Sequence, residues 1–320
     1  MPSRRTLLTS SAALATALAG CADLGNDSGD GSDTPDGDGT TTPGGTVDDD
    51  PLGWLPAPAS GTTASFTAND IERVYELADL VEAYDPGRMP PVRYAPAPVG
   101  IDRSALAYAV HTNWSFQQAV RAEFDRAAAE SRLDENGTYE RAETTAGFAL
   151  YAGGQVDVAV GDGRICWSAS NLDDGVDPTL TAAVEAKAGD GDRALATNDR
   201  LASLVDRLGT GLEYGGEAAA EGTLDTDLPG PLIAYGGRTA LDGERVTVER
   251  HLVYDGADDV PDDDARDDLL ADLAETTQPL SAADLTAEVD GDALVVSGTI
   301  EASAWVEALG GGGTATTAGE

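Results

Sequence analysis

Three short turn signals constrain the fold of this chain more than any other feature of the sequence. Asx-Gly pairs between alternating apolar and polar runs favour antiparallel hairpins, because glycine and Asx residues tolerate the backbone angles of tight turns. Each signal is followed by a run rich in Val, Ile or Leu, and the first is also preceded by one. The three signals are Gly161-Asp162-Gly163, Asp242-Gly243 and Asp290-Gly291. The sequence therefore predicts antiparallel strands around residues 156–167, 246–254 and 294–300.

Apolar stripes with helical spacing predict segments that would cover such a sheet. Thr67 precedes Asp70 by three residues, which is the spacing of a capping box, and the stripe that follows runs from Ile71 to Val81. Ser115 and Gln118 repeat this spacing, so a second helix is expected there. Three more helices are expected at Asp177-Pro178, at the leucines from Leu201 to Leu208 before Gly209, and at the aspartates 262–264.

Hairpins combined with helices predict an α+β fold, in which antiparallel sheets built from hairpins pack with amphipathic helices. Composition divides the chain into a signal peptide (1–20), a lipidated cysteine with a disordered acidic Gly/Thr/Asp tether (21–53), a globular α+β domain (54–309) and a disordered tail (310–320). The order helix, hairpin, helix is loosely repeated along the domain. Two related halves, 54–220 and 228–309, are therefore an open alternative to one undivided unit.

The first 21 residues have the layout of an export signal. Arg4 and Arg5 precede an apolar run, Leu7 to Ala19, that is too short to span a bilayer. The arginine pair resembles a twin-arginine signal. The end of the run, Leu18-Ala19-Gly20-Cys21, resembles the lipobox of exported lipoproteins, which implies that Cys21 carries lipid and becomes the new N-terminus. The alternative is a plain cleaved signal in which Cys21 is incidental.

Acidic residues dominate the charge of the chain. It has 58 Asp and Glu against 19 Lys and Arg, a formal net charge of −39, and removal of Arg4 and Arg5 with the signal would leave 17 basic residues and a charge of −41. Such self-repulsion is tolerated in concentrated salt. Together with the signal and the lipobox, this composition resembles the exported lipoproteins of halophilic archaea. The resemblance implies a membrane-anchored, extracellular location, and it implies no activity.

The charge also bears on partners. Binding of nucleic acid is disfavoured, because a phosphate backbone requires clustered Lys and Arg, and this sequence has none. An acidic protein that binds metal ions or basic partners is the alternative to halophilic adaptation. The acidic tether is not an EF-hand, because Gly37 stands where the bidentate glutamate is required. Sequons for N-glycosylation are found at Asn26, Asn113 and Asn136, and Asn136-Gly137 is the most favourable because such a turn is exposed.

Few residues in the sequence are suited to catalysis. His251 alternates in phase with Thr247 and Glu249, so it is expected on the solvent side of a strand, and His111 is expected to pack at a strand end. Cys166 is predicted to be a buried thiol inside a strand. The sequence contains no nucleophile elbow, zinc helix, phosphate loop or dinucleotide fingerprint. It therefore predicts no catalytic residues, no cofactor and no metal site.

The function expected from these features is that of a non-enzymatic surface lipoprotein that acts through binding or assembly, with an unknown protein or small-molecule partner. A solute-binding component of a transporter is an alternative suggested by the same anchor, although hairpins argue against its usual parallel sheets. A hydrolase is a further alternative, because carboxylates distant in sequence can form an acid/base pair. Trp114 and Trp167 could stack on a sugar, but core packing is the preferred interpretation.

Overall fold

Within the residues that the computed structural model describes (50–82, 84–86, 99–169, 175–226, 228–276, 280 and 283–310), twelve strands form one antiparallel sheet. The predicted α+β class with an antiparallel sheet is confirmed. The strands are β1 (Ala64–Asp70), β2 (Leu106–Thr112), β3 (Gln118–Ala122), β4 (Tyr139–Thr145), β5 (Phe148–Gly153), β6 (Val156–Gly161), β7 (Arg164–Ala169), β8 (Glu213–Ala218), β9 (Leu232–Asp242), β10 (Arg245–Tyr254), β11 (Thr286–Asp290) and β12 (Ala293–Glu301).

The helices of the described residues connect or follow these strands. They are η1 (Pro51–Trp54), α2 (Ile71–Leu80), η4 (Arg103–Ala105), α4 (Arg126–Glu135), α5 (Pro178–Ala188), α6 (Ala194–Thr197), α7 (Asp199–Leu208), η5 (Ala257–Asp259), α8 (Asp263–Thr276) and α9 (Ala302–Gly310). None of them has the length and apolar character that crossing a bilayer requires.

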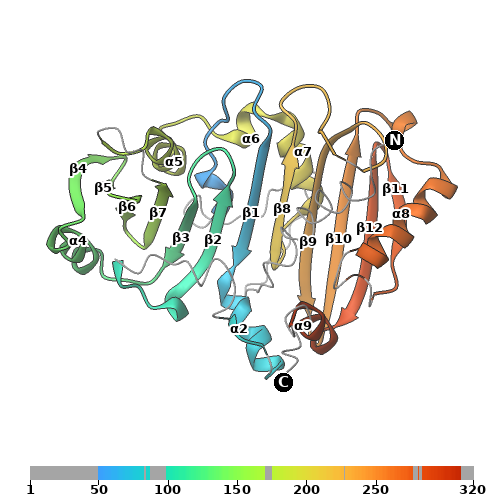
Figure 1. The fold of residues 1–320 in the computed structure, drawn as a ribbon, viewed down its shortest axis with the longest axis horizontal. Helices are drawn as coiled ribbons and strands as arrows, with labels where there is room; N and C mark the ends of the chain where they lie inside the picture. The colour runs from blue at the N-terminus through green and yellow to red at the C-terminus, as the bar shows by residue number, and fades with distance from the viewer. Residues whose placement is uncertain are drawn as a thin grey trace, which may run out of the picture.

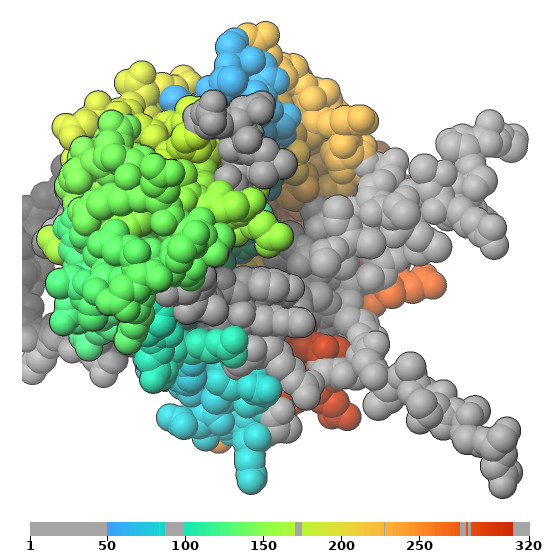
Figure 2. Space-filling view, turned by 60° about the vertical axis from the view of Figure 1, so that its left-hand side comes forward, coloured from blue at the N-terminus to red at the C-terminus, as the bar shows by residue number. Residues whose placement is uncertain are grey.

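The chain enters the sheet at its middle and fills the two sides in turn (Figure 1). The strand order is β11-β12-β10-β9-β8-β1-β2-β3-β7-β6-β5-β4. After β1, the strands β2 to β7 build one side, α5 to α7 return to the middle, and β8 to β12 build the other side. Figure 2 shows the first side from its end, with green residues above the cyan residues that include α2. The two sequence halves therefore share one sheet, and they meet where β8 pairs with β9.

Both faces of the sheet are covered by helices. On one side, which we call the α7 face, α5, α6 and α7 pack on Phe66, Cys166 and Tyr214. On the opposite side, the α2 face, α2, α4 and α9 pack on one cluster that includes Val120 and Val248. Helix α8 covers a separate cluster on the α2 face, formed by Leu232, Leu252, Tyr254, Leu294 and Val296 together with its own Leu269 and Leu273.

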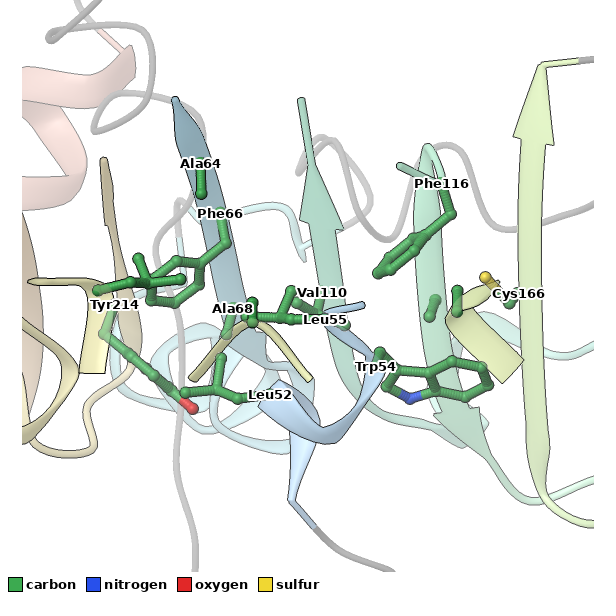
Figure 3. Packing of buried hydrophobic residues seen from close by; sticks show 14 of the residues in the cluster. Leu52, Trp54, Leu55, Ala64, Phe66, Ala68, Val110, Phe116, Cys166 and Tyr214 are labelled. Carbon is green, nitrogen blue, oxygen red and sulfur yellow. The ribbon is translucent and has the colours of Figure 1, made fainter. Parts of the chain in front are cut away.

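The segment around η1 is docked on the α7 face. Trp54 is fully buried, with its ring edge-on to those of Phe116 and Phe148 at 6.4 and 5.5 Å. Figure 3 shows Trp54 on the side of Phe116 and Cys166, and Leu52 on the side of Tyr214. Because Leu52 is also buried, the packed structure begins before residue 54, and the last residues of the predicted tether belong to the domain.

Lys187, the one lysine of the chain, holds this segment in place. Only 3% of Lys187 is exposed, and its Nζ donates a hydrogen bond of 2.7 Å to the carbonyl oxygen of Asp50. The same Nζ lies 5.9 Å from the ring centroids of Trp54 and Tyr108, within the range of cation–π attraction. The single lysine of the sequence therefore ties the η1 segment to α5.

The three predicted turns are confirmed. Gly163, Gly243 and Gly291 have φ angles of 63°, 58° and 64°, a left-handed conformation that glycine adopts at little cost. They connect β6 to β7, β9 to β10, and β11 to β12, and each pair is antiparallel. The alternating pattern therefore identified three of the hairpins correctly.

Two of the predicted helix starts and one predicted helix end are confirmed. The carboxylate of Asp177 accepts the Thr179 N–H at 2.9 Å before α5, and that of Asp262 accepts the Ala265 N–H at 3.1 Å before α8. Helix α7 ends at Gly209, which has a φ of 61°. These helix ends depend on hydrogen bonds and backbone conformations of neighbouring residues, so they can be recognised in a single sequence.

Both predictions made from capping-box spacing need correction. Thr67 lies inside β1, and α2 begins only at Ile71, directly after the strand. The expected helix after Ser115 is absent from the described residues, because residues 118–122 form β3 between β2 and β7. The Ser115 hydroxyl instead donates to the carbonyl oxygen of Thr179 at 3.2 Å. Pairing with two neighbouring strands overrides the local helical pattern.

Asp70, at the junction of β1 and α2, makes stability depend on pH. Burial raises its pKa from 3.8 to about 7, and Glu72 adds to the rise. Between these two values the folded protein keeps a proton that the unfolded chain releases, so this group makes stability fall as pH rises through the window. Replacement of Asp70 with Asn removes the ionisation and retains a good helix-capping residue.

We expect Asp70→Asn to gain about 3 to 4 kcal/mol of stability over the wild type between pH 4 and pH 8. The measurement is urea unfolding at both pH values in the same concentrated salt. Asp125→Asn is the matched control, since Asp125 also precedes a helix, and its carboxylate caps the Ala128 N–H. If the stability difference between Asp70→Asn and the wild type stays constant across this pH range, Asp70 ionises normally.

Candidate functional site

The structure places the two histidines on opposite faces of the sheet. His111 is paired with Thr67, and His251 with Gly236. Only 7% of His251 is exposed, so the prediction that it faces solvent is wrong: α7 packs across β8, β9 and β10 on that side. His111 is half-buried near the end of β2, as expected. Burial lowers the pKa of both imidazoles. The two histidines cannot serve one site as an acid–base pair.

The other residues considered for chemistry have structural surroundings. Cys166 is completely buried, and burial raises the pKa of its thiol, as expected for a small core residue. Trp167 is buried in the α2-face cluster, and the Trp114 indole N–H donates to the Pro56 carbonyl oxygen at 3.2 Å. Both tryptophans are therefore packing residues, as the preferred interpretation held.

The predicted anchor and modification residues are only partly described. Arg4, Arg5, Cys21 and Asn26 lie outside the described residues. Asn113 is exposed beyond β2, where its Oδ1 accepts the Ser65 N–H at 3.0 Å. Asn136 ends α4 and is half-buried, and its Oδ1 accepts the Thr138 N–H at 3.2 Å.

A feature that sequence reasoning missed lies where β8 and β9 pair. Each strand contains a Tyr-Gly-Gly triplet, at 214–216 and 235–237, and the two are aligned so that Gly215 is opposite Gly237 and Gly216 opposite Gly236. On the α7 face, a Cβ at Gly216 would lie 2.6 Å from Leu204, so this pair lets α7 approach closely. On the α2 face, Gly215 and Gly237 form the floor of a depression. The repeated triplet was the sequence signal for this site.

Arg250 lies across this floor from β10. It pairs with Gly237, and a Cβ at that position would come within 2.5 Å of its Nη1, so only glycine leaves room for the guanidinium. Thr67 on β1, Glu213 on β8 and Tyr235 on β9 line the same depression. Three consecutive strands, β8 to β10, and the distant strand β1 thus supply one polar cluster.

The guanidinium of Arg250 is buried, and no carboxylate of the described residues is in ion-pair contact with it. Arg250 is 5% exposed. Its Nη1 donates a hydrogen bond of 2.7 Å to the Glu249 carbonyl oxygen, and its Nε has no hydrogen-bond partner. No carboxylate of the described residues lies within 4.0 Å of its nitrogens. Burial lowers its pKa to about 10, so it remains a cation at neutral pH. A buried charge without an ion-pair contact is costly.

Glu213 is the nearest acidic group on the same face, and burial changes its character. It is 3% exposed, and burial raises its pKa well above the ordinary value, while Arg250 opposes the rise. The Asn69 amide donates to Glu213 Oε2 at 3.2 Å, and the Asn69 Oδ1 is buried without a partner. Burial and the Arg250 charge therefore act in opposite directions on the pKa of Glu213, so the two buried groups are coupled electrostatically.

A second, apolar cavity adjoins the depression. It lies between the sheet and α8 and is lined by Leu228, Leu252 and Leu273, and it shares Tyr235 and Arg250 with the polar depression. The polar and apolar spaces therefore meet at Arg250. The described residues contain no group of three or more His, Cys, Asp and Glu side chains placed to hold a metal ion.

Comparison with known proteins finds weak structural similarity to solved structures. No protein family and no curated protein matches the chain. Among solved structures, crystal forms III and I of TP0453 are each 13% identical, with TM-scores of 0.47, and they cover 82% of this chain and 98% and 97% of their own. Crystal form IV is 14% identical, with a TM-score of 0.44 over 81% of this chain and 95% of its own. Similarity at this level assigns no function.

Proposed function

We propose that this chain is a lipid-anchored protein on the outer face of the cell membrane, and that it acts by binding a small molecule rather than by catalysis. The twin-arginine pattern at Arg4-Arg5 and the lipobox that ends at Cys21 support the location. The observation that carries the binding function is the buried, unpaired guanidinium of Arg250 beside an open depression. A ligand in this depression would lie beside Arg250, Glu213 and Glu217, which line it together.

A solute-binding component of a transporter is a second candidate, although the antiparallel sheet of the described residues argues against it. It is favoured by the position of Arg250 between a polar depression and an apolar cavity, since binding sites for small molecules combine apolar walls with a few placed polar groups. The separation of His111 and His251 by the sheet gives catalysis no comparable support.

Anchoring can be tested through Cys21. We expect the native protein to partition into the detergent phase of a Triton X-114 extract of its host. Cys21→Ser should instead be found in the medium or as uncleaved precursor, because the thiol that would carry the lipid is gone. Cys166→Ser is the matched control, since that thiol is buried in the domain and should leave partitioning unchanged. Equal partitioning of wild type and Cys21→Ser would refute the anchor.

The export route can be tested in the same cells. Replacement of Arg4-Arg5 with two lysines conserves charge but removes the receptor-read pair, so folded precursor should accumulate in the cytoplasm. Unchanged export would argue for transport of the unfolded chain.

A further inference from the structure

We propose that the edge strand β11 binds an extended, basic segment of a partner protein as an additional strand of the sheet. This surface is separate from the depression at Arg250, and the inference does not depend on ligand binding there. It follows from three properties of the edge: main-chain groups that point away from β12, an exposed apolar side chain, and a strongly acidic border.

The outer side of β11 carries main-chain groups that have no strand partner in the described part of the chain. β11 is the last strand in the order of the sheet and pairs with β12 alone. The two-residue turn after Asp290 closes on the pair of Asp290 with Ala293, and hydrogen-bonded pairs alternate along the hairpin from such a closing pair. The N–H and C=O groups of Ala287 and Val289 therefore point away from β12, where an extended segment can bond to them.

The opposite edge of the sheet, β4, differs in this respect. The register of β4 on β5 shifts between Arg141 and Thr144, which places a bulge in that edge strand. Bulges are among the features that keep edge strands from pairing with other chains. The register of β11 on β12 is regular over all 5 of its residues, and the strand contains neither proline nor lysine. Its outward groups therefore form an uninterrupted row that a second strand can follow.

Val289 extends the apolar cluster beneath α8 to this edge. It is paired with Leu294, which is fully buried in that cluster, yet Val289 itself is 47% exposed. Ala287, two residues earlier on the same face, packs against the cluster. Neighbouring strands place paired residues on the same face, so an apolar side chain of an added strand would lie beside Val289 and cover it. The edge therefore favours a partner with apolar residues at alternate positions.

Charge indicates what the other positions of the partner would be. Helix α8 packs beside β11 at one end of the sheet (Figure 1). Residues 255–292, which include both elements, contain fourteen Asp and Glu and a single basic residue, Arg266. At the other end, residues 126–153 contain five acidic and three basic residues. Arg207 of α7 pairs with Asp290 and Asp292 and neutralises only part of this charge. A basic segment therefore complements the β11 end specifically.

A second copy of this chain suits the edge less well. If two β11 strands paired antiparallel about Glu288, the outward groups of Ala287 in one would bond to those of Val289 in the other. The two Glu288 side chains would then lie directly opposite each other, and like charges in that position are destabilising. An arginine or lysine opposite Glu288 would instead form an ion pair. The structure therefore favours a partner strand in which basic and apolar residues alternate.

The test is a calorimetric titration of the full mature chain, made lipid-free by Cys21→Ser, in about 0.5 M KCl, where attraction between distant charges is screened. The probe is a short blocked peptide in which arginine and valine alternate. One control peptide has glutamate in place of arginine, and the other keeps the arginines but carries a methyl group on each valine nitrogen.

We expect the arginine–valine peptide to bind at least about tenfold more tightly than either control. The glutamates of the first control would lie opposite Glu288. The second control lacks the N–H groups that would face β11, because residues opposite Ala287 and Val289 are those in hydrogen-bonded pairs. Hydrogen exchange followed by NMR gives an independent readout: the bound peptide should slow exchange of the Ala287 and Val289 amides about tenfold or more.

Variants assign the binding to this edge. Val289→Pro removes an outward N–H and leaves the bonds to β12 in place, so peptide binding should be lost. Thr144→Pro is the matched control, since Thr144 also precedes the closing residue of its hairpin by one position, on the edge strand β4. If Val289→Pro fails to fold, Glu288→Lys tests the same edge and should weaken binding about tenfold. Glu143→Lys makes the same change in net charge on β4 and should leave binding unchanged.

Several outcomes would overturn the inference. Equal binding of the N-methylated peptide would show attraction to an acidic surface without strand addition. Equal weakening by Glu288→Lys and Glu143→Lys would show that net charge alone matters. A dimer in analytical ultracentrifugation that Val289→Pro dissociates would assign the edge to a second copy of the chain. Failure of the arginine–valine peptide to bind would remove the basic partner.

Discussion

Replacement of Trp54 with alanine is expected to lower the free energy of unfolding by about 3 to 5 kcal/mol, the usual cost of removing a large buried aromatic side chain. Trp54 is fully buried on the α7 face, where its ring contacts Phe116 and Phe148. Its indole N–H donates to the hydroxyl of Tyr108 at 3.2 Å. Alanine would leave a cavity beside the sheet and remove the ring over which the Lys187 ammonium lies.

Urea unfolding in concentrated salt measures this loss, with two variants for comparison. Trp54→Phe keeps a ring in the same space and loses the hydrogen bond to Tyr108, so its effect should be smaller. Leu80→Ala is the surface control, because Leu80 is 49% exposed and its truncation should cost less than about 0.5 kcal/mol. A Trp54→Ala variant as stable as Leu80→Ala would mean that η1 contributes nothing to the core.

Salt is expected to have the second large effect on this protein. The chain carries a net charge of −39, and the basic residues are too few to pair with most of the carboxylates. Raising the ionic strength from about 0.15 to 1 M shortens the Debye length from about 8 to about 3 Å, which screens most repulsion between surface carboxylates. The melting temperature should therefore rise by roughly 10 °C or more across this range, as stabilisation by several kcal/mol requires.

Thermal melting in KCl, followed by circular dichroism, measures this dependence. An isosmolar sucrose series is the control, because sucrose favours burial without screening charge. Screening predicts a rise in KCl that levels off once the Debye length is short, and a smaller rise in sucrose. A melting temperature independent of KCl would indicate that the carboxylates are already neutralised, and would return attention to bound cations.

Local chemistry explains which elements could be predicted. The hairpins at Gly163, Gly243 and Gly291 depend on a turn residue and on alternation of period two, and both are visible in the sequence. The capped helices α5 and α8 depend on a side chain that bonds to a backbone N–H two or three residues away. Interactions of this range need no knowledge of the rest of the chain.

Strands that pair over long distances could not be predicted in this way. Residues 118–122 carry a helical pattern but lie between β2 and β7, and both neighbours bond to them. The prediction for His251 failed for a related reason: alternation separates the two faces of a strand, but it does not say that α7 buries the second face. In both cases partners distant in sequence decide the outcome.

The α+β class, the turns, the capped helices and the scarcity of basic residues can be read from the sequence, because each follows from neighbouring residues or from composition. The candidate site, in contrast, depends on long-range packing. Register brings Thr67, Gly215, Gly237 and Arg250 into one row across four strands. The burial of Arg250 then follows from the helices that cover the α2 face. Its unpaired charge is a property of that packing, since in an unfolded chain the same guanidinium would be solvated by water.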